Sequence, residues 1–148
     1  MRALGARLAN ALRAARLTEP FVFGLSGDLG AGKTTLVGGL LTALGHEGPA
    51  RSPTYTLIEP YRLAGRDLFH CDLYRLRDPA ELDDLGLRDL LVGPVVLLVE
   101  WPERAGGRLR DPDVRLQIEY SGEGRSLSLT PNSDAGRRLV AGLGLDPA

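Results

Sequence analysis

Lysine is nearly absent from this chain of 148 residues, and cysteine, methionine and tryptophan occur once each. Of the 18 lysine and arginine residues, Lys33 is the only lysine. The single cysteine, Cys71, excludes an internal disulfide and is consistent with a reducing compartment. The net charge of −1 excludes a basic field over the whole surface. Any contact with RNA would therefore come from a local patch or through a partner protein.

Long apolar runs are absent as well. No run reaches the length that a membrane-spanning helix needs. The N-terminal segment carries Arg7, Arg13 and Arg16 between its apolar residues, which indicates an amphipathic helix rather than a secretory signal peptide. We therefore expect a cytoplasmic protein with no membrane contact. The length, the apolar content of 43% and the lack of a low-complexity linker predict a single domain over residues 1–148.

Glycine is plentiful, with 19 residues, and three of these fall in a segment that matches the phosphate-binding pattern G-x-x-x-x-G-K-[ST]. The segment reads Gly27-Asp28-Leu29-Gly30-Ala31-Gly32-Lys33-Thr34. An apolar run at 21–25 precedes it and helical spacing over 34–44 follows it, which is the context that the pattern requires. Backbone N–H groups and the start of a helix bind anions in such a loop.

Two side chains of this loop predict specific contacts with ATP and Mg²⁺. Lys33 is expected to reach the β- and γ-phosphates, and the Thr34 hydroxyl is expected to bind Mg²⁺. A chain that uses arginine everywhere else has an ammonium here. A compact ammonium acts as a point charge where a planar guanidinium does not fit.

Strand-like and helix-like segments alternate around the loop. Helices are expected at 3–16, 34–44, 79–85, 86–92 and 132–143, and strands at 21–26, 54–61, 67–72, 95–101, 114–119 and 127–129. The turn at 64–66 pairs two of these strands as an inserted antiparallel hairpin. The pattern predicts an α/β fold of the P-loop NTPase class, with a central, mostly parallel sheet flanked by helices. Ligands of such sheets bind at the carboxyl ends of the strands.

Two carboxylates are candidates for the metal and for catalysis. A phosphate-binding loop normally works with an aspartate at the end of an apolar strand. The most apolar strand here, 95–101, carries Glu100 instead, and its longer side chain somewhat favours orienting water over holding the metal. Asp72, at the end of the 67–72 strand, is the other candidate. The plain alternatives are an ordinary strand-end carboxylate for Glu100 and a turn or capping aspartate for Asp72.

Other residues carry weaker signals. Ser52 and Thr54 lie where nucleotide switches sense the γ-phosphate and Mg²⁺, although Ser-Pro-Thr also fits a plain turn. Trp101 fits equally a core or rim aromatic and an anchor for a lid or partner. His70 is interpreted as structural, and Cys71 as a buried small apolar residue.

Four blocks, at 27–35, 52–57, 70–76 and 99–103, resemble in order and spacing the TsaE family of small bacterial ATPases. These proteins are needed for the threonylcarbamoyladenosine modification of tRNAs. The loop is shared with many nucleotide-binding proteins, whereas the blocks H-x-D-L-Y-R and E-W-P-E are far more specific. The resemblance covers nearly the whole chain.

The resemblance implies an ATP-binding and ATP-hydrolysing protein that acts with Mg²⁺ as a switch or reset ATPase on a complex of TsaB and TsaD. Contact with tRNA would be indirect, through that complex. The implied catalytic residues are Lys33, Asp72 and Glu100, and the implied metal ligands are Thr34, Asp72 and Glu100. The implied nucleotide contacts are Gly27, Asp28, Leu29, Gly30, Ala31, Gly32, Lys33, Thr34, Thr35, Ser52, Thr54, Trp101 and, at the adenine, Arg125.

Three rival functions can be weighed on composition and motif. A GTPase reads guanine with an N-K-x-D motif, and no lysine follows Lys33. A small-molecule kinase fits the size and the loop, with Asp72 as the base and the arginines of 106–110 as a lid, and stays open as an alternative. An assembly factor that hydrolyses ATP only as a timing step is not separable from a switch ATPase by sequence.

Overall fold

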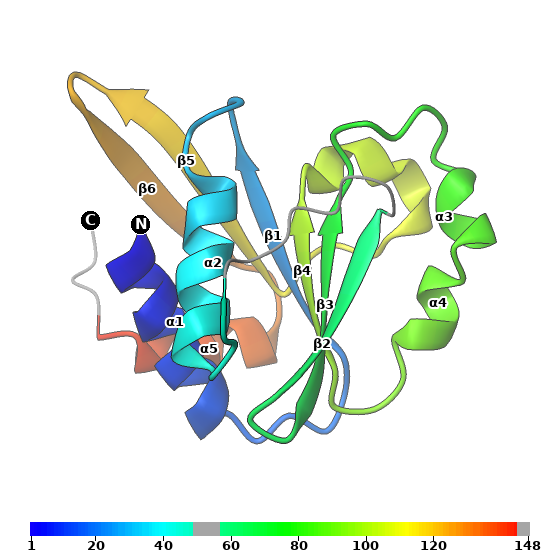
Figure 1. Cartoon of the computed structure of the whole chain (residues 1–148), viewed down its shortest axis with the longest axis horizontal. Coiled ribbons are helices and arrows are strands. Elements are labelled where there is room, and N and C mark those ends of the chain that lie inside the picture. The colour runs from blue at the N-terminus through cyan, green and yellow to red at the C-terminus, as the bar shows by residue number, and fades with distance from the viewer. Residues whose placement is uncertain (49–56, 145–148) are drawn as a thin grey trace.

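Six strands form one sheet in the computed structural model, which describes residues 1–48 and 57–144. The strands are β1 (Phe21–Gly27), β2 (Ile58–Leu63), β3 (Arg66–Asp72), β4 (Val96–Glu100), β5 (Val114–Ser121) and β6 (Gly124–Pro131). Their order across the sheet is β2-β3-β4-β1-β5-β6 (Figure 1). The pairs β1–β4, β1–β5 and β3–β4 are parallel, whereas β2 and β6 run antiparallel at the two edges. The predicted mostly parallel sheet with an inserted antiparallel hairpin is confirmed.

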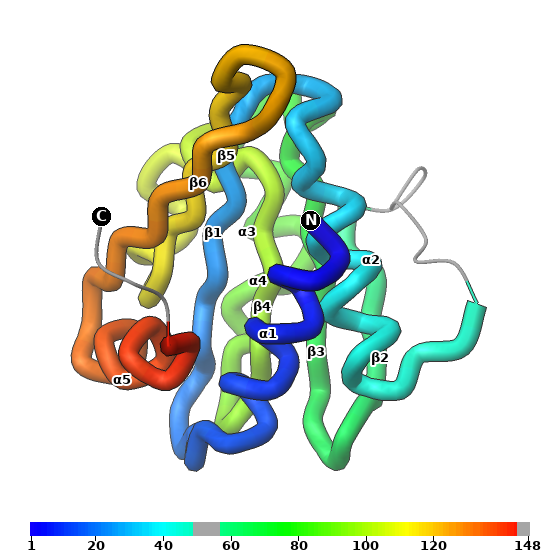
Figure 2. Tube along the Cα trace, turned by 90° about the vertical axis from the view of Figure 1, so that its left-hand side faces the viewer, coloured from blue at the N-terminus to red at the C-terminus, as the bar shows by residue number. Residues whose placement is uncertain are grey.

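Helices cover both faces of this sheet (Figures 1 and 2). The helices α1 (Arg2–Ala14), α2 (Lys33–Ala43) and α5 (Asp134–Gly142) pack on one face. The short helices α3 (Glu81–Asp84) and α4 (Leu87–Leu90) and the 3₁₀ helix η1 (Pro102–Arg108) pack on the other. Central strand β1 is apolar on both sides, as a parallel strand between two helical layers requires, with Phe21 and Phe23 in one core and Val22 in the other.

Helices α1 and α2 approach each other closely at a glycine. A Cβ atom added to Gly5 would lie 2.5 Å from the carbonyl oxygen of Leu36 and 2.6 Å from the amide nitrogen of Leu40. Only a residue without a side chain fits between the two backbones. This contact lays α1 against α2, the helix that follows the glycine-rich loop.

Most predicted elements agree with the structure, and the differences lie at their ends. Helix α2 ends at Ala43, followed by Gly45 with a φ of 107°, as expected of a glycine stop. The strand predicted at 54–61 is described from Ile58 and continues to Leu63, and its first residues lie outside the described part. The helix predicted at 79–85 is a single turn, Glu81–Asp84, and Asp78 accepts from the Ala80 amide in the turn before it. The 3₁₀ helix η1 was not predicted.

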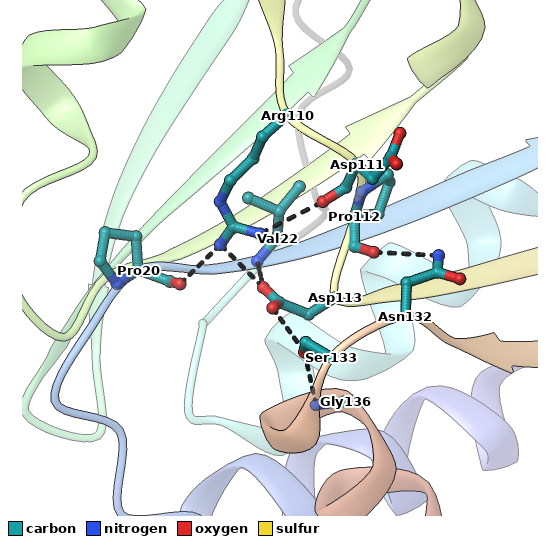
Figure 3. A network of polar contacts seen from close by, with 9 residues as sticks. All are labelled: Pro20, Val22, Arg110, Asp111, Pro112, Asp113, Asn132, Ser133 and Gly136. Carbon is teal, nitrogen blue, oxygen red and sulfur yellow. Dashed lines mark hydrogen bonds and ion pairs between the residues drawn. The ribbon is translucent and has the colours of Figure 1, made fainter.

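A network of polar contacts links the amino ends of β1 and β5 to the start of α5 (Figure 3). The buried carboxylate of Asp113 accepts hydrogen bonds from the Val22 amide at 2.7 Å, the Arg110 guanidinium at 2.9 Å and the Ser133 hydroxyl at 2.7 Å. Ser133 also caps α5, since its Oγ accepts from the Gly136 amide at 3.0 Å. Burial acts to raise the pKa of Asp113, but the hydrogen bonds from Arg110, Val22 and Ser133 outweigh it and hold this pKa below its usual range.

Within the described residues, no helix is long and apolar enough to cross a membrane.

Candidate functional site

The carboxyl ends of β1, β3 and β4 meet at one edge of the sheet (Figure 1). A pocket of about 180 Å³ opens there. It is lined by Leu29, Gly30, Gly32, Lys33, Thr34, Thr35, Asp72, Tyr74, Glu100 and Trp101. Two larger hollows, of about 530 and 570 Å³, lie beside α1 and α5. Their described lining includes none of the residues that the sequence names for the site, so we place the candidate site in the smaller pocket.

Glycine sets the shape of the loop between β1 and α2. Gly32 has a φ of 118°, in the left-handed region, and directly precedes the first residue of α2. A Cβ atom on Gly27 would lie 2.5 Å from the Ile118 carbonyl oxygen of the neighbouring strand. The Ala31 amide donates to the Asp28 carbonyl at 3.0 Å and tightens the turn. The N-terminus of α2 is therefore held at the pocket, where it can receive an anion.

Lys33 lies folded into this loop. Its Nζ donates to the carbonyl oxygens of Gly27 at 2.5 Å and Asp28 at 2.9 Å, and it lies 4.4 Å from the centre of the Trp101 ring. Burial lowers the pKa of Lys33, and the nearby carboxylates, Glu100 first among them, act in the opposite direction. The cation is thus held at the floor of the pocket by backbone dipoles and an aromatic face.

Thr34 and Glu100 contact each other across the pocket. The Thr34 hydroxyl donates to Oε1 of Glu100 at 3.0 Å. The other carboxylate oxygen, Oε2, lies 2.6 Å from Nε2 of His70. Glu100 is 2% exposed and His70 is fully buried. Both oxygens of this carboxylate are therefore oriented by named partners.

Asp72 lies beside Glu100 because the two residues are paired in the parallel ladder of β3 and β4. Its Oδ1 accepts from the Tyr74 amide at 3.1 Å, which turns the chain at the end of β3. Burial raises the pKa of Asp72, the hydrogen bond from Tyr74 opposes this, and the neighbouring Glu100 raises it further. The site therefore contains two adjacent carboxylates whose mutual repulsion a cation would relieve.

An aromatic and cationic cluster forms one wall of the pocket. The rings of Trp101 and Tyr74 lie 5.3 Å apart, and the Arg104 guanidinium lies 5.3 Å from the Trp101 ring and 5.1 Å from the Tyr74 ring. Trp101 has a φ of 61°, which is unusual for a bulky residue, and its amide donates to the Leu25 carbonyl at 3.0 Å. Strained backbone of this kind clusters at functional sites.

Arg125 reaches the loop from the hairpin of β5 and β6. Its NH2 lies 3.5 Å from the Gly30 carbonyl, and its guanidinium lies 5.2 Å from the Tyr120 ring. This places an exposed cation at the mouth of the pocket, whereas its predicted contact with adenine stays a prediction. Ser52 and Thr54 lie outside the described residues.

Two residues at the pocket were not predicted as site residues. His70 was interpreted as structural, which agrees with its full burial, and its ring also contacts Glu100. Tyr74 lines the pocket and was not named as a site residue. A signal for His70 was available, because residues two apart on a strand share a face, so His70 and Asp72 had to lie on the same side of β3. Cys71 points to the opposite side into a core, and burial raises its pKa to about 12, as fits an unreactive thiol.

The donor set fits Mg²⁺ that shares its coordination with a bound phosphate. Mg²⁺ takes oxygen ligands and is commonly held by one or two carboxylates together with substrate phosphates. The Thr34 hydroxyl, Glu100 and Asp72 supply such oxygens around the pocket. In residues 1–48 and 57–144, no group of three or more His, Cys, Asp or Glu side chains could hold a metal ion by itself.

Comparisons with known proteins identify the family. A family model described as "Threonylcarbamoyl adenosine biosynthesis protein TsaE" matches residues 1–127. The TsaE protein of Haemophilus influenzae is 44% identical over 117 residues, which cover 79% of this chain and 74% of that protein. The TsaE protein of Streptomyces coelicolor is 43% identical over 122 residues, which cover 80% and 78%.

A solved structure supports the fold. YdiB of Bacillus subtilis superposes with a TM-score of 0.74 at 29% identity, and the match covers 95% of this chain and 86% of YdiB. The family match over residues 1–127 includes the loop and the carboxyl ends of β3 and β4, and the two relatives match most of the chain. The chain therefore belongs to the TsaE family of tRNA threonylcarbamoyladenosine biosynthesis proteins.

Proposed function

We propose that this chain is a Mg²⁺-dependent ATPase that acts as a switch on a TsaB–TsaD complex during threonylcarbamoyladenosine formation on tRNA. The observation that carries the ATPase part is the contact of the Thr34 hydroxyl with Glu100, 3.0 Å long, at the start of the helix behind the glycine-rich loop. The threonine proton is used by the carboxylate, which leaves the hydroxyl lone pairs for a cation. The family membership supports the role in tRNA modification.

Each side chain has a role in this reaction. The loop amides and Lys33 bind the β- and γ-phosphates and counter the charge that develops when water attacks the γ-phosphorus in line with the leaving oxygen. Thr34 and Glu100, with Asp72 beside them, would hold Mg²⁺, which when bound would neutralise charge on the phosphate oxygens.

The two carboxylates have different roles in this proposal. Glu100 has both oxygens engaged by Thr34 and His70, so we assign it to the metal. Asp72 lines the pocket next to it and can orient the attacking water. Side-chain length alone somewhat favours Glu100 as the residue that orients water. The proposed assignment is the opposite, with Glu100 at the metal and Asp72 at the water.

The partners and the cellular place are part of the proposal. Hydrolysis would reset the TsaB–TsaD complex, tRNA would be contacted only through that complex, and the protein would act in the cytoplasm. The predicted hydrolysis by the chain alone is slow, and addition of TsaB and TsaD accelerates it.

Reconstitution of tRNA modification from purified components tests this function. The reaction is run with TsaB and TsaD and either the wild-type chain, the K33A variant or no addition, and both modified tRNA and released phosphate are measured. Sustained modification and faster phosphate release are expected only with the wild-type chain. Phosphate release that does not change when TsaB and TsaD are added would contradict the switch, and transfer of phosphate to a small acceptor would favour a kinase.

A further inference from the structure

His70 lies beneath the pocket as a fully buried imidazole with a single polar contact. Its Nε2 is 2.6 Å from Oε2 of Glu100, and its Nδ1 has no hydrogen-bond partner among the described residues. A buried polar atom without a partner costs stability, which an apolar side chain of similar size would avoid. Packing therefore does not explain a histidine at this position, whereas the contact with Glu100 does.

The contact joins two rigid strands. His70 pairs with Leu98 in the parallel ladder of β3 and β4, and Glu100 follows Leu98 on the same face of β4. A glutamate has three side-chain torsions and by itself populates several rotamers. An imidazole N–H at Nε2 holds one carboxylate oxygen, so the other is left at 3.0 Å from the Thr34 hydroxyl.

We propose that His70 is a positioning residue that acts through Glu100 to set the Mg²⁺-binding geometry of Thr34. This inference rests on the proposed ATPase function and assigns a residue to it. Outer partners that orient metal-binding side chains typically change metal affinity by about 10- to 100-fold when they are lost. Loss of the imidazole is therefore expected to affect Mg²⁺ use much more than nucleotide binding as such.

The test measures ATP binding by titration calorimetry at a series of Mg²⁺ concentrations and in EDTA. The H70L variant removes the donor, and H70Q restores an N–H at a similar reach. We expect H70L to raise the Mg²⁺ concentration for half-maximal ATP binding by about 10-fold with little change in EDTA, and H70Q to recover most of this loss. C71A is the control for general loss of stability in β3, because Cys71 faces the opposite core.

A double-mutant comparison with Glu100 separates positioning from support of the fold. If His70 acts through Glu100, the variant H70L/E100Q needs no more Mg²⁺ than E100Q alone. Additive effects, an unchanged Mg²⁺ dependence of H70L, or an equal shift in C71A would overturn the inference. The wild-type chain distinguishes the two proposals: no ATP binding by it overturns both, whereas normal binding with an unaffected H70L overturns only the role of His70. Should H70L fail to fold, H70N takes its place, since its amide is too short to reach Glu100 as Nε2 does.

Discussion

The Thr34 hydroxyl donates a hydrogen bond to Glu100 over 3.0 Å and so links the first turn of α2 to the end of β4. A glutamate occupies the place where P-loop proteins commonly carry an aspartate. Nε2 of His70 lies 2.6 Å from Oε2 of Glu100 and orients this longer side chain. The extra methylene is thus compensated by a partner on β3, and this side of the pocket is built from three elements that are distant in sequence.

Replacement of Lys33 should weaken ATP binding. K33A is expected to weaken ATP affinity by about 10- to 100-fold, because the lost ammonium makes charge-assisted hydrogen bonds with phosphate. K33R should not restore it, since a planar guanidinium does not fit between two loop carbonyls and the Trp101 ring. Equilibrium binding of a labelled ATP analogue measures both, with R137A, an exposed cation on α5, as the control. Full affinity in K33R would contradict the packing argument.

The hydroxyl of Thr34 should be needed for Mg²⁺ and not for the fold. The isosteric variant T34V is expected to raise the Mg²⁺ requirement of ATP hydrolysis by about 10-fold, whereas T34S keeps the hydroxyl and stays close to the wild type. Phosphate release against Mg²⁺ concentration is the measurement. T42V, on the exposed face of the same helix, is the matched control. A T34V variant that needs no more Mg²⁺ than T34S would contradict the role of the hydroxyl.

Removal of the charge of Glu100 should slow hydrolysis more than it weakens binding. For E100Q we expect a loss of about 100-fold or more in the single-turnover rate, with ATP affinity in EDTA within about twofold of the wild type. E119Q, an exposed carboxylate at the end of β5, serves as control. Normal hydrolysis combined with lost ATP binding would be the opposite result and would refute the assigned role.

The Asp113 network should contribute stability that depends on pH. D113N is expected to lower the free energy of unfolding at pH 7 by about 1–3 kcal/mol, because the Val22 amide and the Ser133 hydroxyl lose a charged acceptor. The pKa of Asp113 is depressed in the folded chain, so this stability is present above the unfolded value of about 3.9 and is lost as pH falls through the folded value. Urea unfolding of both proteins between pH 7 and pH 3 measures the difference. D111N, which changes an exposed neighbour, should leave the free energy of unfolding unchanged over the same pH range.

Replacement of a glycine by alanine should have opposite effects on stability in helices α1 and α5. G5A is expected to destabilise the fold by about 1–3 kcal/mol, because the new methyl group would lie 2.5 Å from the Leu36 carbonyl. G142A, at the end of α5 with open space around it, should stabilise by about 0.5–1 kcal/mol through reduced entropy of the unfolded chain. Thermal unfolding of the two variants measures both effects, and a G5A variant as stable as the wild type would contradict the close approach of the two helices.

Much of the candidate site could be predicted from short sequence segments, because the interactions that shape the loop are local. The loop from Gly27 to Thr34 needs glycines for its backbone and a helix start behind it, and both are visible in a dozen residues. Asp72 and Glu100 could be placed together because the carboxyl ends of parallel strands meet at one edge. The end of α2 followed from Gly45 in the same way.

What the sequence by itself determined is therefore the order of most elements, the glycine-rich loop and the edge of the sheet at which this loop lies. Only the tertiary structure decided which side chains touch: His70 with Glu100, Trp101 over Lys33, and Asp113 with both Val22 and Ser133. Periodicity specifies the face on which a residue lies, but contacts between strands depend on register and rotamer. Those are set by the packing of the whole sheet and its two helical layers, and no single segment contains them.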